Sequence, residues 1–362
     1  MKRPMNKRIL LSSMFGLTLA CIQVNAQENS EGVDWKEDVA SRITMHGYAQ
    51  GQYIATSADD KNSNTFLLKR TLLWGEAKIT DRWSFLFMHD FNSEVQEYYT
   101  DYRVTKNKAL SVRVGQFKTS LSHENALSPT ILESIDVFSE GVTYLTGCGS
   151  DPLIGTQFGR DQGILLYGET NNKALHYELN VVNGTGVNKK DKNNQKDVIG
   201  KVEVRPTSDL AIIATGQLGT GCAQVSNPIF NPTLNAGDNF KRNRWTAGFD
   251  YKAKSFSVRG EYLWGQDGSV HSRGAYASGT VRLATLPKTK ALDFVWSYDY
   301  FNFNTTQKQD MHKVVAGLQF WFFKRCRFQA QYVYKNANTD YKTFFNGDDV
   351  HQLLCQMQVR FN

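Results

Sequence analysis

The last ten residues impose the strongest constraint on what this chain can fold into. In LLCQMQVRFN, every second residue from Leu353 to Phe361 is apolar, and Gln356, Gln358 and Arg360 lie between them. Because successive side chains of a β-strand point to opposite faces, this pattern predicts a strand with apolar surroundings on one face and water on the other. A terminal strand frays unless it is paired. We therefore expect this strand to be hydrogen-bonded along its length.

The same alternation recurs along the chain in short, aromatic-rich segments. Clusters of Gly, Asn, Asp, Lys and Ser separate these segments, as expected for strands and turns. The sequence has no run of 18 apolar residues and no heptad pattern, which excludes a helical membrane protein. About sixteen strands are predicted, at 43–56, 65–79, 82–91, 97–105, 109–118, 161–169, 173–183, 197–205, 209–218, 242–253, 255–265, 272–284, 290–301, 311–323, 326–335 and 349–361.

The predicted connections alternate between short turns and longer loops. The short ones include 80–81, 106–108, 171–172 and 206–208, and the long ones include 119–160, 184–196, 219–241, 302–310 and 336–348. Short turns on one rim and long loops on the other are typical of outer-membrane barrels. The fold class is therefore all-β: a transmembrane antiparallel β-barrel of about 16 strands, wide enough to enclose a water-filled lumen. The first and last strands must pair, because an open edge in lipid leaves backbone groups unsatisfied.

The N-terminal segment indicates export. Residues 1–26 combine a basic start, an apolar stretch and a small-residue cleavage motif, which predicts a signal peptide that is removed. Lipid attachment at Cys21 is the weaker alternative, because Thr18-Leu19-Ala20 is a poor context for it. Four of the 42 Lys and Arg residues lie in this segment, so the mature chain carries 38 basic against 35 acidic residues. The high isoelectric point is thus no argument for nucleic-acid binding, and we expect residues 27–362 to form a single barrel domain.

Two motifs carry a resemblance to a known family. LSVRVGQFKTSLSHENALSPT (110–130) and FGRDQGILLYG (158–168) resemble segments of the phosphate-selective porin O and P family, although the family more often has Pro where Ser120 stands. The resemblance implies a trimeric barrel of sixteen strands in a Gram-negative outer membrane. It further implies that the third extracellular loop, residues 119–160, folds inward and narrows the pore. The length of this loop supports the same conclusion independently, because long structureless loops are usually functional.

Candidate solute-contacting residues follow from strand parity and from this loop. Clustered Arg and Lys side chains suit an anion, and charged side chains at a constriction set channel selectivity. The predicted pore-lining cations are Arg70, Arg103, Arg113, Lys118, Arg160, Arg205, Arg259 and Arg282. Residues 120–159 contain no Lys or Arg, and their acids are expected to oppose the basic wall across a water-filled slit. The predicted constriction-loop acids are Glu124, Glu133, Asp136 and Glu140, and Asp151 is the fifth acid of this stretch.

Other chemistry in the sequence is sparse. It contains no H-E-x-x-H, C-x-x-C or G-x-S-x-G motif, so we expect no metal site, no cofactor and no enzymatic activity. Calcium bound by the loop aspartates Asp59-Asp60 and Asp348-Asp349 remains an alternative. Cys148 and Cys222 both lie in predicted external loops, and a disulfide between them remains open.

Three classes of function compete. A passive porin, which lets small hydrophilic solutes or ions diffuse across the outer membrane with an anion or phosphate preference, explains the export signal, the sorted loops and the motifs together. A barrel-based adhesin or receptor without significant transport is the alternative, although no loop exceeds about forty residues. A soluble secreted β protein does not explain the sorted loops. We expect partners to be outer-membrane lipid, the barrel assembly machinery through the near-terminal Phe361, and two further copies of the chain.

Overall fold

The computed structural model describes residues 41–58, 61–149, 151–228, 230–288, 290–338 and 349–361. Residues Ile43–Asn362 form the unit that is described below. The predicted signal peptide lies outside the described residues. Within them, no helix has the length and apolarity required to cross a bilayer.

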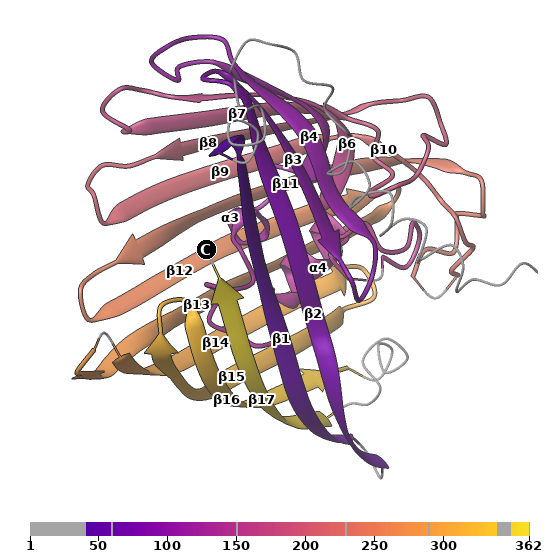
Figure 1. The fold of residues 1–362 in the computed structure, drawn as a ribbon. Coiled ribbons are helices and arrows are strands. Elements are labelled where there is room, and N and C mark those ends of the chain that lie inside the picture. Colours follow the sequence, from indigo (N-terminus) through magenta and orange to yellow (C-terminus); the bar gives the residue numbers. More distant parts are fainter. Residues whose placement is uncertain are drawn as a thin grey trace, which may run out of the picture. The chain divides into compact units, whose positions relative to one another are not determined.

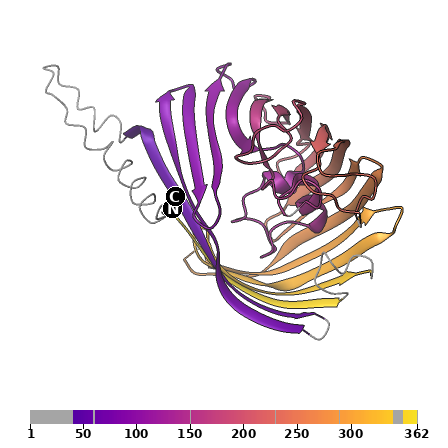
Figure 2. The same cartoon turned by 90° about the vertical axis from the view of Figure 1, so that its right-hand side faces the viewer.

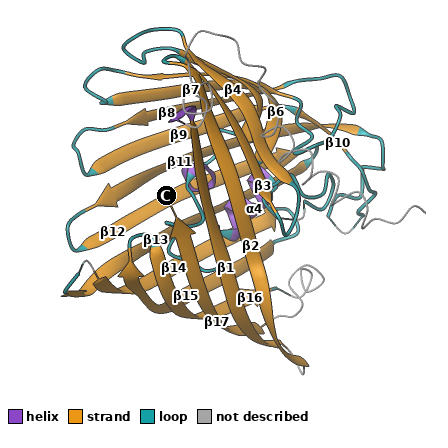
Figure 3. Ribbon diagram, in the orientation of Figure 1, coloured by secondary structure: helices purple, strands orange, loops and turns teal. Residues whose placement is uncertain are grey.

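Seventeen strands make up most of the described part of this unit (Figure 1; Figure 3). Their bounds match the predicted strands closely, apart from the additional short strand β10. They are β1 (Ile43–Ala58), β2 (Lys61–Thr80), β3 (Trp83–Asp90), β4 (Val95–Arg103), β5 (Ser111–Lys118), β6 (Arg160–Glu169), β7 (Leu175–Val182), β8 (Asp197–Val204), β9 (Leu210–Leu218), β10 (Thr220–Cys222), β11 (Asn239–Lys252), β12 (Phe256–Asp267), β13 (Val270–Leu286), β14 (Lys290–Asn304), β15 (Gln309–Phe323), β16 (Cys326–Ala337) and β17 (Asp349–Phe361).

The strands close into a ring, as the alternation at the chain end requires. Apart from β10, each strand pairs antiparallel with the next strand along the chain, so that β9 pairs with β11. The short β10 pairs with β11 alone. The last strand, β17, pairs with β1 over all but its first residue, from Gly47↔Phe361 to Ala58↔Val350. The sixteen strands other than β10 thus form a closed antiparallel barrel, which confirms the predicted fold.

The outer face of the barrel is apolar, and the inner face carries most of the charge. Large apolar side chains that a soluble protein would bury are exposed on alternate positions of the strands, for example Phe85 and Phe87 on β3. Charged side chains such as Arg242, Arg244 and Arg327 are fully buried inside. This inverted arrangement places the apolar face against lipid and the polar face around a lumen.

One rim differs from the prediction in its detail. The connection at 302–310, which was expected to be long, is short, and β1 and β2 extend beyond their predicted ends to Ala58 and Lys61 and pair there with each other. In the same way, β14 and β15 continue to Asn304 and from Gln309. The ladder hydrogen bonds satisfy the backbone of these extensions, so no irregular loop is needed.

The long connection between β5 and β6 lies inside the ring of strands (Figure 2). It contains two short helices, α3 (His123–Ala126) and α4 (Glu140–Thr146). Ser122 and Ser139 cap the helix N-termini through their side-chain oxygens, and Gly147 ends α4 with a positive φ of 65°. Such caps satisfy backbone N–H groups that a helix start otherwise leaves unpaired. We call residues 119–159 the inner loop.

Candidate functional site: the lumen and its inner loop

The inner loop is attached by its acids to the wall formed by β12, β15 and β16. Glu133 pairs with Arg259 of β12. Glu140 accepts from Lys335 at 2.8 Å and from Lys313 at 3.1 Å. Burial alone would raise the pKa of Glu140, but the two ammonium groups outweigh it and lower the pKa to about 2. The carboxylate is therefore ionised at neutral pH and holds α4 against the wall.

The start of the loop is attached to neighbouring strands by hydrogen bonds. The Ser122 hydroxyl and the His123 backbone N–H donate to the carboxylate of Glu261, at 2.8 and 2.9 Å. Glu124 is buried, and its carboxylate accepts from the Ser139 backbone N–H at 2.7 Å. Burial raises the pKa of Glu124 to about 7, so this acid carries little charge below neutral pH.

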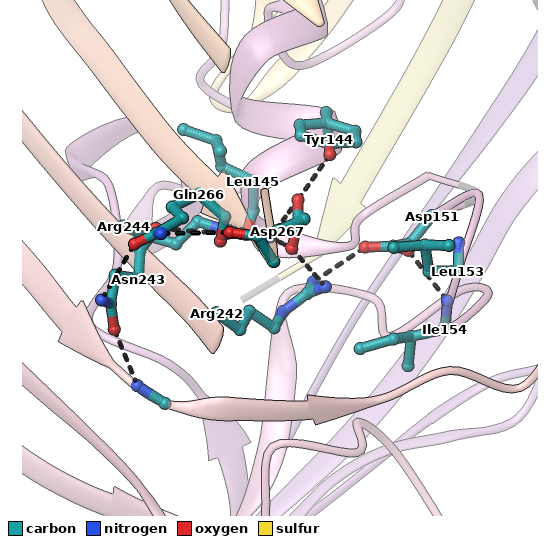
Figure 4. A network of polar contacts seen from close by, with 12 residues as sticks. Tyr144, Leu145, Asp151, Leu153, Ile154, Arg242, Asn243, Arg244, Gln266 and Asp267 are labelled. Carbon is teal, nitrogen blue, oxygen red and sulfur yellow. Dashed lines mark hydrogen bonds and ion pairs between the residues drawn. The ribbon is translucent and has the colours of Figure 1, made fainter. Parts of the chain in front are cut away.

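A fully buried ionic network fixes the end of α4 and the segment that follows it (Figure 4). Arg242 of β11 donates to Asp151 of the loop at 2.8 Å. Arg244 donates to both oxygens of Asp267, at 2.7 and 3.0 Å, and the Tyr144 hydroxyl donates to the same carboxylate at 2.6 Å. Removing one member of a buried charge pair typically costs about 3–5 kcal/mol, because its partner stays desolvated. This region of the loop is thus held in one position.

A ladder of glutamine side chains joins the loop to the closing seam of the barrel. Gln50 donates to Gln358 at 2.9 Å and Gln52 to Gln356 at 2.7 Å, across the β1–β17 pair. The Gln358 amide also donates to the Thr130 carbonyl of the inner loop at 3.2 Å. On β16, two more glutamine amides donate to the Glu133 carbonyl, those of Gln329 at 2.9 Å and Gln331 at 2.7 Å.

Open space remains between the loop and the opposite wall, which β1 to β7 form. One cavity of about 370 Å³ lies toward the rim of the β3–β4 connection, because Asn92 and Ser93 line it. A second cavity of about 430 Å³ lies toward the short turns, because Arg360 and Tyr167, near the ends of β17 and β6, line it. The two share five lining residues: Tyr48, Leu72, Lys118, Pro129 and Arg160. We call this shared region the waist, and the two spaces the outer and inner chambers.

The waist and the outer chamber carry more cations than acids, although Asp90 and Asp136 also line the outer chamber. Lys118 donates to the backbone carbonyls of Asn125 at 2.9 Å and Leu127 at 2.7 Å. Arg160 pairs with Glu97 at 2.8 Å. Arg70 donates to the Gln50 side chain at 3.1 Å and lines the outer chamber next to Lys69. Among the described residues, no carboxylate forms an ion pair with Lys118, Lys69 or Arg70.

A β-bulge explains why two successive cations face the same space. Gln50 pairs with Arg70 and Gly51 with Leu68, so Lys69 is an additional residue in β2. A bulge reverses the alternation, and the residues on both sides of it can then point to one face. Sequence parity predicted Arg70 in the lumen but not Lys69, because no residue type marks this bulge.

The structure brings together only some of the predicted cations. Arg70, Lys118 and Arg160 border the outer chamber and the waist, and Arg113 lines the inner chamber, where it donates to Asp101 at 2.7 Å. The others differ from the expectation that they line a common pathway. Arg259 lies behind the loop on Glu133, Arg205 and Arg282 pair with Glu203 and Asp293 near the short turns, and Arg103 is half-buried at the end of β4.

The predicted loop acids also differ in their placement. Asp136 borders the outer chamber, whereas Glu124, Glu133 and Glu140 line neither chamber. The physical reason is that buried carboxylates need partners, and the wall behind the loop supplies them. Sequence reasoning missed two of these partners, Lys313 and Lys335. Each lies in a run where apolar residues occupy both faces, such as Val314-Val315, so the parity of the strand is ambiguous there.

The remaining chemical candidates stay separate. Cys148 and Cys222 are free thiols rather than a disulfide, and the Cys148 thiol donates to the Asn125 side chain at 3.3 Å. In the part of the chain that the structure describes, no three metal-ligating side chains come together. Of the four loop aspartates considered for calcium, Asp59, Asp60 and Asp348 lie outside that part. Asp349 begins β17 and accepts from the Tyr334 hydroxyl at 2.6 Å.

A closed ring of sixteen strands around a charge-lined lumen, with one long loop folded inside it, defines an outer-membrane porin, a passive diffusion channel of a Gram-negative bacterium. The family resemblance is confirmed over residues 40–196, which match the model of the family described as phosphate-selective porin O and P.

Solved porin structures share the fold at low sequence identity. An anion-selective porin from Comamonas acidovorans aligns with a TM-score of 0.62 and 11% identity, over 88% of this chain and 99% of that chain. OprB from Pseudomonas putida gives 0.63 and 7%, over 91% and 96%. The channel DcaP of Acinetobacter baumannii gives 0.57 and 11%, over 88% and 97%. No curated protein sequence matches this chain significantly.

Proposed function

We propose that this porin conducts small hydrophilic solutes passively and favours anions, with the inner loop as its constriction. The observation that carries the proposal is the charge at the waist. Lys118 and Arg160 line the shared region of the two chambers, and Lys69 and Arg70 precede it. Arg160 is neutralised by Glu97, whereas the other three form no ion pair with a described carboxylate.

The loop acids do not cancel this charge, because most of them are engaged elsewhere. Glu133 and Glu140 pair with cations of the wall behind the loop, and the buried Glu124 bonds to a backbone N–H. Asp136 is the acid of the loop that borders the outer chamber, and it lies 3.6 Å from Lys335. A low-dielectric constriction with an excess of one charge raises the local concentration of the opposite ion. The pathway should therefore admit anions more readily than cations.

Phosphate is one anion to test, because the matched family is described as phosphate-selective. Arg and Lys both donate well to phosphate oxygens. The three cations without an ion pair to a described carboxylate, however, lie on one side of the pathway. Lys69 and Arg70 line the outer chamber, and Lys118 lies at the waist. We therefore propose a general anion preference and treat a specific phosphate site as a separate outcome.

The proposal also covers the oligomeric state, the export and the membrane assembly of the chain. OmpT of Vibrio cholerae is described in a trimer form, and we propose a homotrimer in outer-membrane lipid for this chain. We also retain the signal peptide at 1–26, assembly through the C-terminal strand, and a channel without enzymatic activity.

The test is the zero-current potential of the purified, refolded protein in a planar bilayer under a KCl gradient. We expect a potential of the sign that chloride selectivity gives, and a smaller one for Lys118→Gln or Arg70→Gln. Lys196→Gln is the matched control, because Lys196 is an exposed loop residue paired with Asp191. A cation-selective potential would refute the anion preference. Verified insertion without conductance would instead favour the adhesin alternative.

A further inference from the structure

The inner chamber differs from the rest of the lumen in the chemistry of its wall. Among its lining residues are Trp74, Tyr99, Tyr167, Leu86 and Leu165. A wall that only had to pass inorganic ions would be expected to be polar, because apolar side chains in contact with lumen water are unfavourable. The apolar surface of this chamber therefore needs an explanation.

Packing against the inner loop explains part of it. Tyr99 and Tyr167 pack on a buried cluster that includes Phe117 of β5 and Leu121 of the inner loop. Trp74 does not belong to any buried apolar cluster among the described residues. Its ring stacks on His46 at 5.1 Å and meets Tyr48 edge-on at 6.3 Å. It is thus held in place with part of its surface toward the chamber.

Two guanidinium groups lie over the aromatic rings of this chamber. Arg113 lies 3.9 Å from the centre of the Tyr99 ring, and Arg360 lies 5.6 Å from the Trp74 ring. Arg113 is ion-paired with Asp101. Arg360 donates to the Thr130 hydroxyl at 2.6 Å and forms no ion pair with a described carboxylate. Lys118 at the waist is, like Arg360, a cation of this chamber that forms no ion pair with a described carboxylate.

The chamber therefore combines an apolar, ring-lined surface with two cations that form no ion pair with a described carboxylate. Its two lining carboxylates, Glu97 and Glu178, are paired with Arg160 and Lys201. Its volume of about 430 Å³ lies in the usual range of small-molecule sites, which pair apolar walls with a few fixed polar groups. Resting on the anion preference proposed above, we propose that the inner chamber is a subsite for small organic carboxylates with an aromatic body. The carboxylate would bind at Lys118 or Arg360, and the ring would pack on Trp74 and Tyr99.

The test compares block of the wild-type channel by sodium benzoate, sodium acetate and inorganic phosphate. Benzoate and acetate share the carboxylate, and only benzoate carries a ring. We expect benzoate to block roughly two- to tenfold more strongly than acetate, the range given by a favourable aromatic contact. Trp74→Leu combined with Tyr99→Leu should remove this difference while chloride selectivity persists. Trp264→Leu on β12, whose ring packs on Trp245 and His271, is the matched control and should keep the difference.

The outcomes separate the two proposals. Equal block by benzoate and acetate in a chloride-selective channel would overturn the subsite and leave the anion preference intact. Block by phosphate stronger than by benzoate would also overturn it. Absence of anion selectivity in the wild type would overturn both. The wild-type comparison needs no variant, so poor folding of the double substitution cannot leave the proposal untested.

Discussion

At the scale of single residues, Lys69 shows how one additional position in a strand changes the charge of a channel wall. The bulge places Lys69 beside Arg70 on the outer chamber. Leu68, before the bulge, is exposed on the outer face of the barrel, and Leu72, after it, is buried on the inner face. Without Lys69, the pairs Gln50↔Arg70 and Gly51↔Leu68 would be consecutive in a regular ladder. The residue is therefore dispensable for register but not for charge.

Deletion of Lys69 tests this directly. We expect the deletion variant to fold and to lose as much anion selectivity as Lys69→Ser, which keeps the bulge and removes the charge. Zero-current potentials measure selectivity, and the heat-dependent mobility of the barrel on a gel reports folding. A deletion variant that does not fold beside a folded Lys69→Ser would mean that the bulge is needed for the strand itself.

Residues of this kind mark the limit of what the sequence predicts. Alternation located the sixteen barrel strands because lipid on one side and water on the other require a period of two. It could not show that Lys69 and Arg70 share a face, since a bulge breaks that period. It also left Lys313 and Lys335 unassigned, because apolar residues on both faces hide the parity. The partners of the loop acids thus emerged only from the folded structure.

At the scale of elements, the inner loop is fixed to the barrel wall by ion pairs between its acids and cations of the strands. The family resemblance implied that this loop folds inward, and the length of the loop supported that expectation. Its route was not predictable, because each attachment joins residues far apart in the chain, such as Glu140 with Lys313 and Lys335.

Acidification should release α4 from the wall in a defined range of pH. The pKa of Glu140 is about 2 in the folded protein against an ordinary value of 4.5. The resulting stabilisation, on the order of 3 kcal/mol, is present above 4.5 and is lost as the pH falls from there toward 2. We expect this attachment to keep conductance and current noise steady between pH 8 and 5, and noise to rise below that range.

Glu140→Gln should show the noisy state already at neutral pH, because the neutral amide cannot replace the ion pairs. Asp191→Asn, an acid of the loop between β7 and β8, is the control and should keep the wild-type profile. Identical pH profiles for Glu140→Gln and the wild type would contradict the assignment of Glu140 as the anchor of α4.

At the scale of the whole molecule, closure depends on a close approach at the seam. A Cβ atom on Gly47 would lie 2.6 Å from the ring of Phe361 and 3.0 Å from the Leu72 carbonyl oxygen. The first contact is a side chain that can be shortened. Glycine at this position therefore makes room for the aromatic residue near the end of the last strand.

Gly47→Ala should reduce the yield of closed barrel on refolding into detergent, and Phe361→Ala in the same chain should restore part of it. Refolding of the purified protein excludes any effect of Phe361 on cellular assembly factors. The heat-dependent gel mobility gives the yield, and Phe361→Ala alone is the control. No recovery in the double variant would mean that the Leu72 carbonyl, not the Phe361 ring, sets the limit.

The glutamine ladder has a consequence for the order of events during biogenesis. Thr130 and Glu133 of the inner loop are held by amides of β16 and β17, the last strands to be synthesised. An assembly intermediate that lacks these two strands would have an unclosed wall, and its inner loop would lack the contacts at Thr130 and Glu133 while keeping those to β11 and β12. The closure of the wall and the final positioning of this stretch of the loop would therefore be completed by the same two strands, β16 and β17.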